Sequence, residues 1–75
     1  MTSPPEWTAE NIHALRKRRG WTREEMARKF YRYMPGTRKA SLASVRQYIA
    51  QWERGATRPG AGDRRILDRL HREAP

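Results

Sequence analysis

Residues 41–59 read SLASVRQYIAQWERGATRP, and this stretch decides the expected fold. At about 100° per residue, its first part predicts a helix with two unlike faces. One face is an apolar stripe made of Leu42, Val45, Ile49 and Trp52, with Tyr48 at its edge. The opposite face has no carboxylate and carries Ala43, Arg46, Gln47, Ala50, Gln51 and Arg54.

The ends of this helix are marked by residues that favour caps. Ser41 is the expected N-cap, with Ser44 as a second candidate one turn later. Gly55 is expected to end the helix after Arg54, because glycine readily adopts the left-handed conformation found at helix C-termini. Glu53 lies at the border of the apolar stripe, where an unpaired charge is costly, so it should have a basic partner.

The polar face has side chains of the kinds that contact base edges. Arginine binds guanine, glutamine binds adenine, and alanine contacts the methyl group of thymine. From this stretch alone two interpretations stay open. The helix is either a DNA-recognition helix or an ordinary amphipathic helix with a solvated basic face.

Composition narrows the class of protein. The 75 residues make one small domain, with 17 Lys and Arg against 8 acidic residues, a net charge of +9 and a pI near 11.3. This balance favours a polyanionic partner, either nucleic acid or an anionic membrane surface. No apolar run reaches membrane-spanning length and the first residues do not resemble a signal peptide. We therefore expect a soluble, cytoplasmic protein; if its partner is nucleic acid, as the helix over 41–54 suggests, it is nucleoid-associated and has no membrane partner.

The residues of this chain do not indicate metal binding or catalysis. The chain has no cysteine, and its two isolated histidines, His13 and His71, lack metal-ligand spacing. We expect both histidines to be surface residues without a ligand role. The sequence shows no nucleophile–base pair and no glycine loop that would hold a phosphate. An enzyme is not expected, and neither a cofactor, a metal nor a small-molecule ligand is implied.

Two W-T pairs mark the starts of the first two helices. Thr8 is the expected N-cap of a helix that ends at Gly20. Thr22 and Glu25 have the spacing of a capping box, which opens a second helix from about Arg23 to Tyr33. The buried side of that helix should contain Met26, Ala27, Phe30 and either Tyr33 or Met34. We expect all three tryptophans to be structural.

The rest of the chain completes the expected organisation. Met34-Pro35-Gly36 should break the second helix, and a polar connection over 35–40 should precede the third. Residues 56–62 are expected to be irregular, and Asp63 should cap a last short helix whose inward residues are Ile66, Leu67 and Leu70. The prediction is an all-α fold of four helices, with a lead-in over 1–7, a domain over 8–72 and a tail over 73–75.

Two sequence blocks resemble the Cro/Xre-type helix-turn-helix domain of phage repressors and bacterial regulators. The first is L-R-x-x-x-G-W-T-x-E-E-x-A (Leu15 to Ala27), and the second is I-x-x-W-E-R-G-x-x-x-P (Ile49 to Pro59). The resemblance covers about Ile12 to Leu70 and is strongest to an actinobacterial-like branch. It implies a lambda-repressor-like fold. The chain departs from the family pattern, because roughly a dozen extra residues separate Ala27 from the core of the third helix. We expect these residues to extend the second helix by a turn and to add a long, basic connection with an exposed loop at Gly36 to Lys39.

The resemblance also implies roles for individual residues. Arg16 and Glu53 correspond to a structural ion pair, and the base-reading positions are Arg46, Gln47, Ala50 and Gln51. The resemblance places contacts to the DNA backbone on Arg23, Arg54, Thr57 and Arg58. Arg38 and Lys39 lie in the inserted loop and are expected to add phosphate contacts. Tyr48 either reaches a phosphate through its hydroxyl or packs against the core. Lys17 to Arg19 are expected mainly to serve the helix C-terminus and solvent. The arginines of the last helix (Arg64, Arg65, Arg69 and Arg72) are expected to form a solvated face.

The function implied is a sequence-specific regulator of transcription, repressor-like, which inserts the third helix into the major groove of double-stranded DNA. Such a protein would come from a bacterium, a phage or a mobile element. Two alternatives stay open: an architectural or recombination-accessory, excisionase-like DNA binder, and a protein-interaction, antitoxin-like module. A homodimer on DNA is possible, since one small domain covers one half-site.

Overall fold

The computed structural model describes residues 5–36 and 41–73, and these residues contain four α-helices and no strand. The helices are α1 (Ala9–Arg19), α2 (Arg23–Arg32), α3 (Leu42–Arg54) and α4 (Ala61–Arg72). The all-α prediction is therefore confirmed for this part of the chain. None of these helices is long and apolar enough to cross a membrane.

Local capping interactions explain why α1, α2 and α3 begin where they do. The hydroxyl groups of Thr8, Thr22 and Ser41 accept hydrogen bonds from backbone amides of the first turns. In α2 the capping box is complete, because the Glu25 carboxylate also accepts a hydrogen bond from the Thr22 amide at 3.0 Å. All three predicted N-caps are confirmed.

Two glycines end α1 and α3 in the left-handed conformation. Gly20 has a φ of 71° and Gly55 a φ of 75°, and each donates its amide to carbonyls of the preceding turn. A side chain is strained at such angles, which explains glycine at these two positions.

The start of α4 differs from the prediction. The helix begins at Ala61 with Gly60 as its N-cap, so Ala61 and Gly62 are helical and Asp63 lies in the first turn instead of capping it. Glycine is tolerated in a first turn when later turns pack well, and a carboxylate there favourably meets the positive end of the helix dipole. The helix ends at Arg72.

The four helices enclose one apolar core. Fully buried side chains come from every helix and include Ile12 and Leu15 of α1, Met26 and Phe30 of α2, Val45 and Ile49 of α3, and Leu67 and Leu70 of α4. Of the two candidates at the end of α2, Met34 is buried and Tyr33 is half-buried. The rings of Phe30 and Trp52 lie 5.6 Å apart and join α2 to α3. The tryptophans follow their predicted structural role, with Trp7 and Trp52 buried and Trp21 packed against the core.

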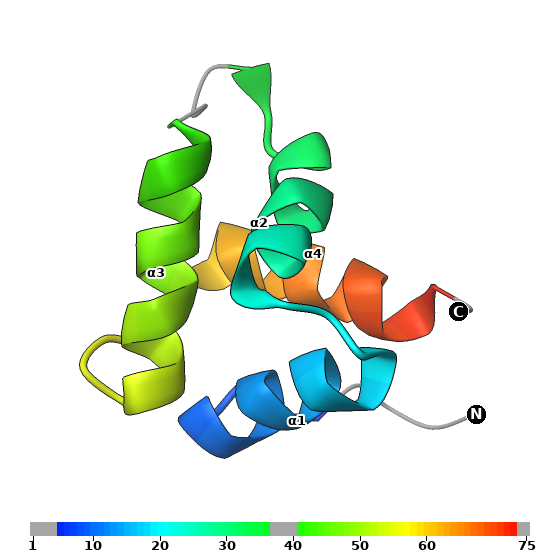
Figure 1. Cartoon of the computed structure of the whole chain (residues 1–75), viewed down its shortest axis with the longest axis vertical. Coiled ribbons are helices and arrows are strands. Elements are labelled where there is room, and N and C mark those ends of the chain that lie inside the picture. The colour runs from blue at the N-terminus through cyan, green and yellow to red at the C-terminus, as the bar shows by residue number, and fades with distance from the viewer. Residues whose placement is uncertain (1–4, 37–40, 74–75) are drawn as a thin grey trace.

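The arrangement leaves one long side of α3 outside the core. Figure 1 shows α3 along one side of the molecule with α2 beside it, whereas α1 lies across one end. The helices that pack most extensively against each other are α2 with α3, then α1 with α3, and then α2 with α4. The helix α3 is therefore fixed by two neighbours while its outer surface stays open.

Candidate nucleic-acid interface

The outer surface of α3 carries the four side chains expected to read bases. Arg46 and Gln47 are exposed, and Ala50 and Gln51 are half-buried. They lie on the opposite side of α3 from its buried residues, Val45, Ile49 and Trp52. No carboxylate lies among them, so this surface presents donors, amides and small methyl groups.

Tyr48 lies at the edge of the same surface. It is 45% exposed, and among the residues that the structure describes it is the one exposed large hydrophobic residue. Its ring is therefore accessible rather than packed into the core.

Glu53 holds the C-terminal half of α3 against α1. Its side chain is 2% exposed, and Arg16 contacts both of its oxygens, with Nε at 3.0 Å from Oε2 and Nη2 at 3.0 Å from Oε1. Arg16 also donates through Nη1 to the Trp21 carbonyl at 3.1 Å. The guanidinium thereby ties α3 to α1 and to the turn before α2. Arg16 and Glu53, which were expected to pair, are in direct contact.

Two further residues join this ion pair, and the sequence reasoning missed both roles. His13 Nδ1 lies 2.7 Å from Oε1 of Glu53, and Arg23 Nε lies 3.7 Å from Oε2. Because a carboxylate only accepts hydrogen bonds, His13 donates through Nδ1. The available signal was position, since His13 precedes Arg16 by three residues and shares its helix face. His13 is exposed, as expected, but it is not without a partner.

The surroundings of Glu53 favour its charged form. Burial raises the pKa of this carboxyl. Hydrogen bonds from Arg16 and His13 and the charges of Arg16 and Arg23 lower the pKa, and together they outweigh the effect of burial. The net result is a pKa below the ordinary value of 4.5. Glu53 is therefore ionised at neutral pH, and its charge is balanced inside the fold.

A groove runs between α3 and the start of α2. Its volume is about 830 Å³, and it is lined by Arg16, Thr22, Arg23, Glu24, Ala43, Arg46, Gln47 and Ala50. Arg23 and Arg46 place two cations on this groove from different helices. Glu24 contributes one carboxylate, which pairs with Arg28 at 3.6 Å. The groove combines cations with the backbone amides at the start of α2, an arrangement that suits an anion.

The other expected backbone contacts divide into two groups. Arg54, Thr57 and Arg58 are exposed at and just after the end of α3, and Thr57 and Arg58 line a second hollow together with Arg64. Arg38 and Lys39 lie outside the described residues. The structure thus brings Arg23 and Arg46 together, and it places Arg58 at the opposite end of α3.

The remaining cations have mostly structural surroundings. Arg19 Nη2 donates to the carbonyls of Leu70 and His71 at 3.4 and 2.9 Å, so it closes the C-terminal end of α4. The Arg69 guanidinium lies 4.1 Å from the centre of the Tyr33 ring. Arg64, Arg65, Arg69 and Arg72 are all exposed, as a solvated face would be.

Comparison of the chain with protein-family models, curated proteins and solved structures found no match. Within the described residues, no group of three or more His, Asp or Glu side chains is placed to hold a metal ion.

Proposed function

We propose that the protein is a sequence-specific regulator that binds double-stranded DNA through α3. In this proposal α2 and α3 form a Cro/Xre-like helix-turn-helix with a lengthened connection, and the protein acts in the cytoplasm on the nucleoid. The observation that carries the proposal is the outer surface of α3. It is basic and amide-rich, and it has no carboxylate of its own. Of the acids near it, Glu53 is turned inward and paired with Arg16, and Glu24 at the start of α2 is paired with Arg28.

The dimensions of α3 suit the major groove. Its 13 residues span about 20 Å, and a B-DNA major groove about 12 Å wide admits one α-helix. In the proposed complex Arg46 and Gln47 read guanine and adenine edges, while Ala50 and Gln51 approach the neighbouring bases. The half-buried Ala50 lets the helix backbone come close to the DNA.

Contacts to phosphates would fix the position of α3. The groove with Arg23 receives one phosphate at the start of α2, where backbone amides and the helix dipole add to the attraction. Arg54, Thr57 and Arg58 contact the backbone at the other end of α3, and Tyr48 does so through its hydroxyl. These contacts supply affinity and orientation, whereas the base-reading side chains supply sequence preference.

A footprinting experiment on DNA flanking the gene of this protein tests the proposal. We expect the full chain to protect a discrete site and the double variant Arg46→Ala/Gln47→Ala to lose that protection. The variant Arg65→Ala is the control, because it removes the same charge from an exposed position of α4. Equal protection by the wild type and the double variant would contradict the proposal.

The arrangement of protected sites separates the proposal from its rivals. An inverted repeat with half-sites about one helical turn apart indicates a two-fold pair on DNA, as expected for a repressor-like regulator. Head-to-tail copies would indicate an architectural binder instead. Featureless coating that disappears with salt would indicate that DNA is not the specific partner, as expected for a protein-interaction module.

A further inference from the structure

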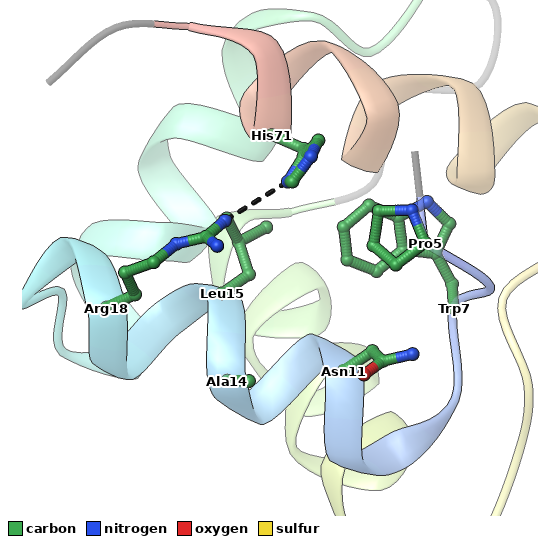
Figure 2. A pocket seen from close by; sticks show the side chains of 7 residues that line it. All are labelled: Pro5, Trp7, Asn11, Ala14, Leu15, Arg18 and His71. Carbon is green, nitrogen blue, oxygen red and sulfur yellow. Dashed lines mark hydrogen bonds between the residues drawn. The ribbon is translucent and has the colours of Figure 1, made fainter. Parts of the chain in front are cut away.

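A second candidate site lies on the other side of α1. It is a pocket of about 250 Å³ formed by the lead-in, α1 and the end of α4, and its lining is Pro5, Trp7, Asn11, Ala14, Leu15, Arg18 and His71. Figure 2 shows the α1 side chains of this set along one side of the helix, with His71 reaching down from α4. Nothing in the proposed DNA contact uses these residues.

The pocket faces away from the contact between α1 and α3. At about 100° per residue, Asn11, Ala14 and Arg18 lie on the opposite side of α1 from His13 and Arg16. His13 and Arg16 are the residues that bind Glu53 of α3. A molecule in this pocket therefore does not compete with one bound on α3.

The walls of the pocket are apolar and held in place. Trp7 is buried, its indole nitrogen donates to Asp68 at 2.7 Å, and its ring meets the His71 ring edge-on at 6.0 Å. Leu15 is only 2% exposed, whereas Ala14 is exposed and contributes a small methyl group. The volume is below the roughly 300–1,000 Å³ of small-molecule sites, so it suits one apolar side chain of a partner.

One end of the pocket carries a cation without a carboxylate partner. Arg18 Nη2 donates to Nδ1 of His71 at 3.1 Å, and no acidic side chain of the described residues forms an ion pair with Arg18. A guanidinium next to a neutral acceptor can still bind a carboxylate through its other donors. The net charge of +9 adds a general attraction for acidic chains.

We propose that this pocket binds an acidic segment of another protein. One apolar side chain of the segment enters between Trp7, Ala14 and Leu15, and an adjacent carboxylate pairs with Arg18. Because the site lies on the far side of α1, the partner binds while α3 is engaged with DNA. Through this surface, the protein bound to DNA would recruit a second protein.

The test uses the full chain and NMR of its amide and indole N–H groups. The probe is a short synthetic peptide of glutamate and glycine with a central Asp-Leu-Asp, and the matched probe has Asp-Ser-Asp. We expect the leucine peptide to shift the Trp7 indole and the Asn11 side-chain amide, and to bind at least about fivefold more tightly than the serine peptide. The same shifts should occur with a DNA duplex already bound.

Three variants sharpen the test. Arg18→Gln should weaken the peptide about tenfold, because it removes a charge-assisted hydrogen bond. Ala14→Gln should weaken it at least about fivefold by filling the pocket, without harm to the exposed helix face. Lys17→Gln is the control: it removes the same charge from the neighbouring exposed position and should change binding less than about twofold.

Five results would overturn this proposal. Equal losses of peptide affinity in Lys17→Gln and Arg18→Gln would show that only the net charge of the protein attracts the peptide. Equal affinities of the leucine and serine peptides would show that no apolar side chain enters the pocket. Shifts confined to α3 would place the peptide on the wrong surface. A DNA duplex that shifts the Trp7 indole directly would make the pocket a nucleic-acid site, and self-association lost in Ala14→Gln would make its occupant a second copy of this chain.

Discussion

Glu53 shows how one side chain links stability to the surface presented by α3. Its carboxylate is almost fully buried, and its contacts with Arg16, His13 and Arg23 come from α1 and α2. The acid that could repel a phosphate is thereby turned into an anchor for the helix that carries Arg46 and Gln47.

Substitution of Arg16 should destabilise the fold, because Arg16 is the main partner of Glu53. We expect Arg16→Met to lower the free energy of unfolding by about 3 kcal/mol, because it leaves a buried carboxylate with weaker partners. His13 and Arg23 remain, which keeps the loss at the lower end of the range for a broken buried pair. Urea denaturation of the full chain measures the change.

The control for this prediction is Arg28→Met, which breaks the exposed pair with Glu24. That pair should contribute about 0.5 kcal/mol or less, since both side chains are largely in solvent. A similar loss in the two variants would show that Arg16 and Glu53 do not form a special anchor.

The lowered pKa of Glu53 predicts a dependence of stability on pH. Because the pKa is lower in the folded state than in the unfolded state, the carboxylate stabilises the fold above about pH 4.5, and this contribution is lost as the pH falls through the folded-state value. The stability difference between the wild type and Glu53→Gln should therefore be largest near neutral pH and should shrink below about pH 4.5. Denaturation at several pH values measures it, with Glu24→Gln as the control. A difference that stays constant through this range would count against the ionised form of Glu53 as the source of stability.

At the scale of elements, the sequence predicts helix ends well where a side chain forms the cap. Thr8, Thr22 and Ser41 were predicted from residue type and spacing alone, since a hydroxyl that caps a helix needs only local geometry. The start of α4 was not predicted, because Gly60 caps it without a side chain and the helix is stabilised by Ile66, Leu67 and Leu70 instead. Its start depends on tertiary packing, which the local pattern does not contain.

The capping box of α2 gives a prediction at this scale. We expect Thr22→Ala to lower the free energy of unfolding by about 1 kcal/mol, because the Glu25 amide then loses its acceptor. The control is Thr57→Ala, an exposed threonine outside any helix. Thermal denaturation of the two variants should differ by several degrees, and equal melting temperatures would show that the cap contributes little.

The candidate site was predictable to different depths. The outer positions of α3 followed from periodicity, and Arg16 with Glu53 followed from the resemblance and from the position of the acid on the apolar stripe. The contacts of His13 and Arg23 with Glu53 required the relative placement of three helices. The pocket at Trp7 and His71 likewise joins residues from the two ends of the chain, which no local pattern brings together.

At the scale of the whole molecule, charge predicts how DNA binding responds to salt. If about six phosphates are neutralised by the cations at both ends of α3, the logarithm of the binding constant should fall against the logarithm of salt concentration with a slope of roughly −5. Arg58→Ala should make this slope less steep by about one while leaving sequence preference unchanged. Fluorescence anisotropy over a salt series measures both, and an unchanged slope would remove Arg58 from the phosphate contacts.

Selection of binding sites from a random duplex library tests whether the outer surface of α3 reads DNA sequence, as proposed. The duplex recovered with the full chain should bind at least about a thousandfold more tightly than a shuffled duplex at physiological salt. Arg46→Ala/Gln47→Ala should remove most of that ratio, whereas Arg65→Ala should keep it. If the library yields no preferred sequence, or if the double variant keeps the affinity ratio between the selected and the shuffled duplex, then α3 does not read DNA sequence.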